Sequence, residues 1–178
     1  GGEGERIVGW GGRATASQLE ARRLELDRAG QRIGPQAKPQ LGLAVALMRR
    51  GMDEVVRMAC ELGIDRIQPL RCDRCVPQAD HRPERWATII REAVEQCERL
   101  WTPQLLDLKD LSQWMADERG QRLVGVTRET APPALDQWLR HQADPVQLTW
   151  LMVGPEGGWT EEELMQFTQA QIQPVQMG

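Results

Sequence analysis

Residues 151–163 read Leu-Met-Val-Gly-Pro-Glu-Gly-Gly-Trp-Thr-Glu-Glu-Glu. This stretch predicts a buried strand that runs into a glycine-rich turn, with a helix beginning directly after the turn. Gly154, Gly157 and Gly158 are expected to allow positive φ angles and a close approach of the backbone to a ligand. Such a turn at the carboxyl edge of a parallel sheet is the usual place for a ligand, and the alternative is a turn with a structural role alone.

Carboxylates surround this turn and indicate what kind of ligand suits it. Thr160 and Glu163 form a capping box, Glu161 and Glu162 add negative charge to the first helical turn, and Glu156 lies in the turn itself. They would repel a phosphate, so a neutral or cationic ligand is favoured. S-adenosylmethionine fits, because it carries a sulfonium and no phosphate. The stretch also lacks the Gly-Lys-Ser/Thr of a P-loop and the spacing of a dinucleotide fingerprint.

From Leu41 onward, short apolar runs alternate with longer helical patterns, which is typical of a mostly parallel α/β sheet. Strands are expected at 41–47, 64–70, 105–108, 122–127, 148–153 and 172–177, the last as an edge strand. Helices are expected at 52–62, after Pro83 with one apolar stripe from Trp86 to Leu100, and at 111–118, 132–141 and 160–169. The sequence stops within the last of these strands, and we expect the natural polypeptide to continue.

Residues 1–40 differ in composition, with many glycines and no regular spacing of apolar residues that would indicate a helix or a strand. Residues 5–10 are expected to form a strand, and 18–27 fit either a strand or a charged helix. The stretch 31–40, with Pro35 and Pro39, is expected to be a linker.

Length and composition bound the class of protein. The chain has 178 residues, 40% of them hydrophobic and 27% charged, with a mean hydropathy of −0.51, which indicates a soluble globular protein. No apolar run approaches the roughly 18 residues of a spanning helix. Residues 1–5 lack the pattern of a signal peptide, so we expect a cytoplasmic protein without membrane partners.

The net charge of −4 conceals an uneven distribution, because residues 101–178 hold eleven acidic and five basic groups. Of the 22 basic residues, 20 are arginines, so a phosphate-binding face would be local and built from arginine. The candidates for contacts to RNA phosphates lie in one loop: Arg71, Arg74, Arg82 and Arg85. The alternative is a solvated loop in which nearby acids pair with these arginines: Asp73, Asp80 and Glu84.

Four cysteines are expected to be reduced thiols. Cys72 and Cys75 have the spacing of half a zinc site, but the sequence holds no second pair of suitable spacing, so no metal is expected. Cys60 and Cys97 lie in helical stripes and are expected in the core. Trp159, beside the glycine turn, is expected either to stack on a base or, more readily, to pack against the core.

Several ordered motifs together resemble the ribosomal RNA small subunit methyltransferase E family. They are Gly154-Pro155-Glu156-Gly157-Gly158, Glu61-Leu62-Gly63-Ile64 with Ile67 and Pro69, and Arg85-Trp86 followed by Glu92, Ala93, Glu95, Gln96, Arg99 and Pro103. The resemblance spans roughly residues 41–178. It implies a SPOUT-class α/β methyltransferase, with a mostly parallel sheet, flanking helices and a C-terminal trefoil knot, preceded by a PUA-like β domain.

This chain departs from the family pattern at its C-terminal end and at several motif positions. The family continues after the position of Met177-Gly178 into an Ile-Leu-Arg-Thr-Glu-Thr-Ala segment that completes the knot and one wall of the cofactor pocket. We therefore expect an incomplete knot in a methyltransferase domain at 41–178, and a partial PUA-like segment with a linker at 1–40. The family also has a lysine where this chain has Met58, and Glu-Arg-Ser where it has Asp73-Arg74-Cys75.

The resemblance implies that a homodimer transfers a methyl group from S-adenosylmethionine to N3 of a uridine in 16S rRNA, free or in the small ribosomal subunit. The residues expected at the cofactor are Val153, Gly154, Pro155, Glu156, Gly157, Gly158, Met177 and Gly178. Arg74 and Arg99 are candidates to stabilise the deprotonated uracil, and Glu156 is a candidate base or a residue that orients the turn. The rivals are a non-catalytic RNA-binding or ribosome-assembly module that retains the fold, and a different nucleotide-using α/β enzyme.

Overall fold

The computed structural model describes residues 39–77, 79, 81–126, 132–141 and 147–176, together with the backbone of four short strands nearer the N terminus. Those strands form two antiparallel pairs, β1 (Glu5–Ile7) with β2 (Arg13–Thr15) and β3 (Leu24–Glu25) with β4 (Arg32–Ile33). β1 lies within the strand expected at 5–10. β3 lies within 18–27, where the sequence fitted either a strand or a helix. β4 falls inside the stretch 31–40, so the expectation of a linker is wrong for its first residues. Pro35 lies outside the described residues, and Gln40, the last residue of the stretch, already belongs to β5 (Gln40–Ala46).

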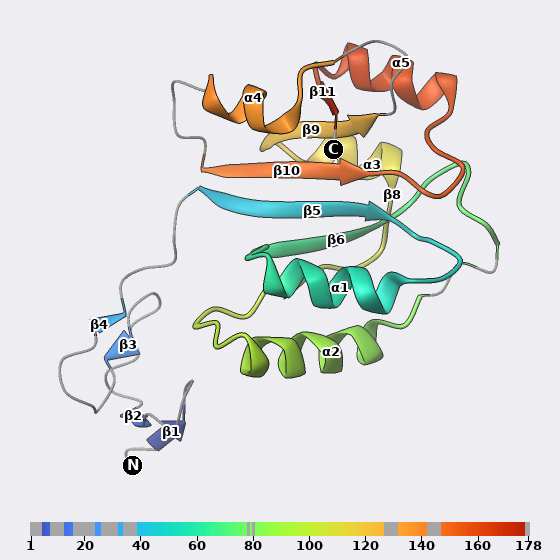
Figure 1. Cartoon of the computed structure of the whole chain (residues 1–178). Coiled ribbons are helices and arrows are strands. Elements are labelled where there is room, and N and C mark those ends of the chain that lie inside the picture. Colours follow the sequence, from blue (N-terminus) through green and yellow to red (C-terminus); the bar gives the residue numbers. More distant parts are fainter. Residues whose placement is uncertain are drawn as a thin grey trace.

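The remaining strands form one parallel sheet of seven (Figure 1). They are β5 (Gln40–Ala46), β6 (Arg66–Arg71), β7 (Gln104–Leu105), β8 (Lys109–Asp110), β9 (Gln121–Val126), β10 (Leu148–Val153) and β11 (Gln173–Gln176). Their order is β11-β9-β10-β5-β6-β7, with β8 also on β6, and every pairing among them is parallel. The expected mostly parallel α/β sheet is thereby confirmed, with β11 at its edge.

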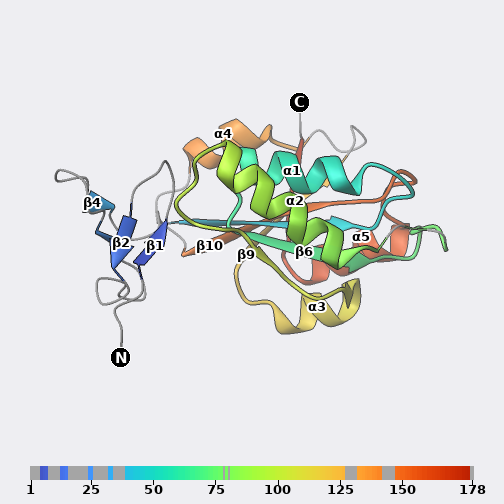
Figure 2. The same cartoon turned by 90° about the horizontal axis from the view of Figure 1, so that it is seen from below.

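Helices cover both faces of this sheet. They are α1 (Met52–Glu61), α2 (Pro83–Gln96), α3 (Leu111–Asp117), α4 (Leu135–Arg140) and α5 (Glu161–Gln169). In Figure 2, α1 and α2 lie on one side of the strands and α3 lies on the other. The two hydrophobic clusters show the same division. One joins the sheet to α1 and α2, and the other joins it to α3 and α5.

The alternation of side chains along β5 supplies both cores. Ala44 and Ala46 belong to the cluster under α3 and α5, whereas Val45 and Leu47 belong to the cluster under α1 and α2. Trp150 of β10 packs across β5 so closely that a Cβ at Gly42 would lie 2.3 Å from its ring, which is why that strand position is glycine. Burial on both sheet faces explains why these strands are continuous apolar runs.

The helix after Pro83 is shorter than its apolar stripe suggested. α2 ends at Gln96, and Glu98 adopts a left-handed φ of 58°, which is incompatible with a continuing helix. Cys97 and Leu100 are consequently exposed, so the expectation that Cys97 belongs to the core is wrong. Cys60, in contrast, is buried as expected.

The expected strand at 105–108 is confirmed only at Leu105, because β7 ends there and β8 begins at Lys109. Both pair with β6, and between them the N–H of Leu106 still donates to the Ile67 carbonyl at 2.9 Å. There the buried side-chain amide of Gln68 donates hydrogen bonds to the carbonyls of Asp107 (2.7 Å) and Pro69 (2.8 Å). The Gln68 side chain thus bonds to the Asp107 carbonyl between β7 and β8, and each partner satisfies the other, because buried polar groups need hydrogen-bond partners.

α4 begins three residues later than the expected 132–141. Pro132 and Pro133 precede it, and a residue before proline is disfavoured in the helical conformation. The Pro133 carbonyl instead accepts a hydrogen bond from the N–H of Gln176 at 3.0 Å, which ties this segment to β11. Among the described residues, no helix has the length and apolar character needed to cross a membrane.

Candidate functional site

The loops that follow β5, β6 and β10 emerge at the same edge of the sheet, because parallel strands end at a common carboxyl edge (Figure 1). Their described residues are 47–51, 72–77, 79, 81–82 and 154–160. This edge is the position expected for a ligand in an open α/β fold.

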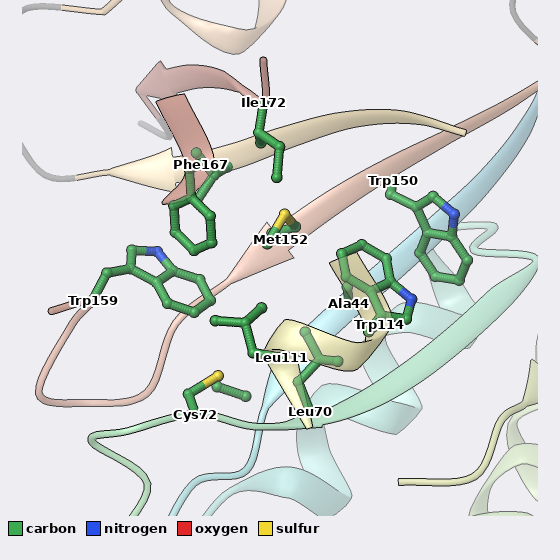
Figure 3. Packing of buried hydrophobic residues seen from close by; sticks show 12 residues of the cluster. Ala44, Leu70, Cys72, Leu111, Trp114, Trp150, Met152, Trp159, Phe167 and Ile172 are labelled. Carbon is green, nitrogen blue, oxygen red and sulfur yellow. The ribbon is translucent and has the colours of Figure 1, made fainter. Parts of the chain in front are cut away.

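The glycine turn at 154–158 is anchored by Trp159. The N–H of Gly158 donates to the Pro155 carbonyl at 2.8 Å, and Gly158 has the left-handed φ of +69° that favours glycine. The indole of Trp159 is buried edge-on to Phe167, with 5.0 Å between ring centroids, and donates to the Gly125 carbonyl at 3.2 Å. Figure 3 shows Trp159 facing Phe167 within the cluster, so it packs against the core.

The three turn glycines differ in backbone conformation and in the space around them. Only Gly158 has a positive φ, so the expectation of positive φ is wrong for Gly154 and Gly157. A Cβ at Gly154 would lie 3.0 Å from the Trp159 ring, which is a close-packing constraint. A Cβ at Gly157 would meet the Arg74 side chain at an ordinary 3.5 Å.

Glu163 joins the turn to the loop after β6. It is only 3% exposed, and its Oε2 accepts from the Thr160 N–H at 2.8 Å while Thr160 Oγ1 accepts from the Glu163 N–H at 3.1 Å. This is the expected capping box. Its Oε1 accepts from the N–H of Asp73 at 3.0 Å, a link between distant segments that the sequence does not indicate.

Arg74 and Glu156 make two further links to the same turn. One guanidinium N–H of Arg74 donates to the Gly157 carbonyl at 2.7 Å, and the Glu156 carboxylate accepts the backbone N–H of Arg49 at 2.9 Å. Hydrogen bonds therefore hold the turn to both neighbouring loops. The structure brings together two of the three candidate catalytic residues with the described part of the candidate cofactor site, Val153–Gly158.

A family model described as an RNA methyltransferase domain matches residues 35–178. The chain belongs to this family.

Individual relatives point the same way. The chain is 36% identical over 141 residues to ribosomal RNA small subunit methyltransferase E of Synechocystis sp., a match that covers 76% of this chain and 46% of that protein. It thus spans about half the length of this curated relative. The resemblance to the methyltransferase E family, drawn from the motifs, is confirmed.

Solved structures are similar as well. A ribosomal RNA small subunit methyltransferase E from Neisseria gonorrhoeae, crystallised with S-adenosylmethionine, matches with a TM-score of 0.70 and 26% identity over 96% of this chain and 72% of that chain. A methyltransferase structure from Legionella pneumophila with bound cofactor matches with a TM-score of 0.68 over 94% of this chain and 70% of that chain. At 23% identity, the second likeness shows the fold alone.

The third candidate catalytic residue, Arg99, lies elsewhere in this family member. Its side chain is 15% exposed and donates to the carbonyls of Cys60 (3.0 Å) and Ile64 (2.8 Å). It also pairs with Asp65 at 3.7 Å, and Asp65 accepts the N–H of Leu41 at 2.9 Å. These contacts are at the amino edge of the sheet, where β5 and β6 begin, so the structure does not bring Arg99 to Arg74 and Glu156.

The candidate RNA-binding arginines do lie at the carboxyl edge, at the end of β6, in the following loop and at the start of α2. Among the described residues, three of these arginines form ion pairs with carboxylates on other elements, and Asp80 lies outside the described residues. Arg71 pairs with Asp110 at 3.6 Å, and both Arg82 (3.9 Å) and Arg85 pair with Asp53 in the first turn of α1. The hydrogen bond and charge of Arg85, together with Arg82, hold the pKa of Asp53 below its usual value. The side chains of the three arginines are nevertheless half or more exposed to solvent.

Cys72 and Cys75 are free thiols in the loop after β6. The N–H of Cys72 donates to the Cys75 sulfur at 3.3 Å. Within the part of the chain that the structure describes, no three His, Cys, Asp or Glu side chains gather as metal ligands. Met177 and Gly178, the remaining candidates for cofactor contact, lie outside the described residues.

Proposed function

We propose that the chain transfers a methyl group from S-adenosylmethionine to N3 of a uridine in 16S rRNA. Membership of the RNA methyltransferase domain family supports the reaction class. The relative crystallised with S-adenosylmethionine, aligned over 96% of this chain, supports the cofactor. The observation that carries the proposal is the Val153–Gly158 turn, which hydrogen bonds hold to both neighbouring loops at the ligand-binding edge of the sheet.

The turn has room and charge suited to this cofactor. No heavy atom lies within 4 Å of the position that a Cβ would take at Gly158, so that side of the backbone is open. Glu156, Glu161 and Glu162 are exposed, and their carboxylates favour a sulfonium over a phosphate. Backbone groups of Val153–Gly158 would hold the cofactor, and we retain Met177 and Gly178 as proposed contacts.

The residues of the site would handle the charge of the target base. S-adenosylmethionine supplies an electrophilic methyl group, and the uridine N3 must lose its proton before it can attack. Arg74 uses one of its N–H groups on Gly157, and its remaining donors suit the oxygens of a deprotonated uracil. Glu156 orients the turn through Arg49 and is the proposed base. We assign Arg99 no part in this step, because it lies at the opposite edge.

The proposed RNA face is the exposed arginine group at the same edge. Arg71, Arg82 and Arg85 would contact phosphates of 16S rRNA, free or in the small subunit, while Arg74 would contact the base. Each of the first three is held by a carboxylate on another element, which fixes its position before RNA binds.

The proposal extends to the organisation of the protein. It comprises a SPOUT-type methyltransferase domain at 41–178 with part of a trefoil knot, a PUA-like segment and linker at 1–40, a homodimeric assembly and a cytoplasmic location. The family match that begins at residue 35 supports the proposed division.

Isothermal titration with S-adenosylmethionine tests the site, with Gly158→Ala as the critical variant. The added methyl group would enter the open side of the turn and would strain a φ of +69°. We expect at least tenfold weaker binding, about 1.4 kcal/mol. Gly63→Ala is the matched control, since Gly63 has a φ of +89° and an equally open Cβ position at the far edge of the sheet.

An equal loss of S-adenosylmethionine affinity in the two glycine variants would show that the turn is not part of the cofactor site. Methyl incorporation into 16S rRNA decides between the functions. Cofactor binding without methyl transfer would indicate the non-catalytic RNA-binding module, and binding of ATP in place of S-adenosylmethionine would indicate a different nucleotide-using enzyme.

A further inference from the structure

Cys72 and Cys75 occupy the two ends of one tight turn after β6. The N–H of Cys75 donates to the Cys72 carbonyl at 3.1 Å, which closes a four-residue turn. Such a turn brings its first and last Cα atoms within about 7 Å, close to the range that disulfides span. The Cys75 sulfur lies 3.3 Å from the backbone nitrogen of Cys72, so it points back across the turn toward its partner.

The two thiols differ in ionisation. A hydrogen bond from the Cys72 thiol, aided by backbone N–H groups of Cys72 and Leu47, lowers the pKa of Cys75 to about 6 against the effects of burial and Glu163. The same hydrogen bond raises the pKa of Cys72, with burial and the charges of Cys75, Glu163 and Asp73 acting in the same direction. These pKa shifts favour ionisation of Cys75 over that of Cys72.

Accessibility matches these roles. Cys75 is half-buried, whereas Cys72 is 6% exposed and lies in the cluster with Leu70 and Leu111 (Figure 3). A small oxidant can reach the thiolate first, and the buried thiol is then the nearest nucleophile. In the described part of the chain, neither cysteine belongs to a group of three or more His, Cys, Asp or Glu side chains that could hold a metal ion.

The residues between the two cysteines hold the candidate cofactor turn. The Asp73 N–H donates to Glu163, and Arg74 donates to the Gly157 carbonyl. A disulfide across residues 72–75 would act on the segment that carries both donors, and through them on the segment 154–163.

We propose that Cys72 and Cys75 form a peroxide-sensitive dithiol whose oxidation to a disulfide loosens the Val153–Gly158 turn. The Cys75 thiolate attacks one peroxide oxygen, the O–O bond breaks, and the departing hydroxide takes up a proton to become water. The Cys72 sulfur then attacks the resulting sulfenic acid, the S–O bond breaks, and a second water leaves with the proton of Cys72. Two thiols lose two electrons, and one peroxide becomes two waters. A dithiol reductant reverses the reaction.

The first test measures the disulfide itself. After hydrogen peroxide treatment, we expect the intact protein to lose two hydrogens, about 2 Da, with the cross-link mapped to the peptide that contains both cysteines. Cys97→Ser, which removes the exposed cysteine, is the control and should leave this loss unchanged. A protein that keeps its mass, that gains oxygen at Cys75 without a cross-link, or that links through Cys97 would overturn the proposal.

Alkylation rates test the ionisation that drives the reaction. The rate of Cys75 modification by iodoacetamide should rise through a midpoint near pH 6 and shift to higher pH in Cys72→Ala, because the first cause of the lowered pKa is then gone. A midpoint that does not respond to Cys72→Ala counts against the hydrogen-bonded pair.

The link to the cofactor site rests on the proposed function and needs a separate measurement. Oxidised protein should bind S-adenosylmethionine at least fivefold more weakly than reduced protein, with recovery on adding dithiothreitol and no change in oxidised Cys75→Ser. Equal affinities would disprove the link. If the reduced protein binds no S-adenosylmethionine, the proposed function fails, while the mass measurement still decides the dithiol.

Discussion

At the scale of single residues, Glu163 is the carboxylate that connects most of the site. It caps its own helix through Thr160 and reaches Asp73 in another loop, and it is 3% exposed. Both of its oxygens accept backbone N–H groups, so a side chain that presents one acceptor and one amide donor cannot replace it without leaving an N–H unpaired.

Glu163→Gln should therefore destabilise the protein by about 1–3 kcal/mol, the cost of a buried donor without a partner. Urea denaturation at pH 7 measures this change. Glu162→Gln is the matched control, since Glu162 is the exposed neighbour on the same helix and should change stability far less. Equal midpoints for Glu163→Gln and the unmodified protein would show that the link to Asp73 contributes nothing.

At the scale of elements, α1 and α2 pack side by side through Asp53. Its carboxylate accepts hydrogen bonds from Arg85 and from the indole of the buried Trp86, the latter at 3.2 Å. These contacts favour the charged form and lower the pKa of Asp53 in the folded state. The contribution to stability is thus present above the unfolded pKa of about 3.9 and is lost as the pH falls through the lower folded value.

Asp53→Asn should lower the thermal midpoint at pH 7, and the gap to the unmodified protein should narrow as the pH falls below about 4, because Asp53 becomes protonated as the pH passes through its lowered folded-state pKa. Melting curves across this range check the sign. Glu54→Gln removes the neighbouring carboxylate, whose pair with Arg57 is exposed, and should cause little change at any pH. A gap for Asp53→Asn that stays constant with pH would contradict the ionic origin.

At the scale of the whole molecule, the charges are segregated. Four arginines, Arg71, Arg74, Arg82 and Arg85, lie between the carboxyl end of β6 and the start of α2, although the chain as a whole carries −4. RNA binding to such a protein depends on one local face, and its affinity should fall with salt in proportion to the phosphates contacted.

Arg82→Ala and Arg74→Ala should separate binding from catalysis. Loss of a phosphate contact at Arg82 should reduce the slope of log affinity against log salt by about 0.7–0.9, irrespective of RNA sequence. Arg74→Ala should lower methyl transfer far more than binding, because Arg74 adjoins the turn. Filter binding at several salt concentrations and methyl incorporation measure the two effects, with Arg91→Ala, further along α2, as control. If neither variant differs from the control, the RNA face lies elsewhere.

Local patterns in the sequence were sufficient for the parallel sheet, most helices, the capping box of Thr160 and Glu163, and the glycine turn. Each depends on neighbours within a few residues, such as the apolar run of β10 or the proline at the start of α2. The same local reasoning failed at the end of α2, where Glu98 reverses its φ, and between β7 and β8, where the amide of Gln68 bonds to the carbonyl of Asp107 in the gap.

Only the tertiary structure decided which candidate side chains meet. Arg74 and Gly157 are 83 residues apart in sequence, and Asp73 and Glu163 are 90 apart, yet each pair is hydrogen-bonded because β6 and β10 both flank β5 and end at one edge. Arg99 carries the same charge as Arg74 and follows α2, which begins near the candidate site. Because α2 runs back toward the amino edge of the sheet, Arg99 lies at that edge and pairs with Asp65. Strand order is a property of the whole sheet, and no local pattern encodes it.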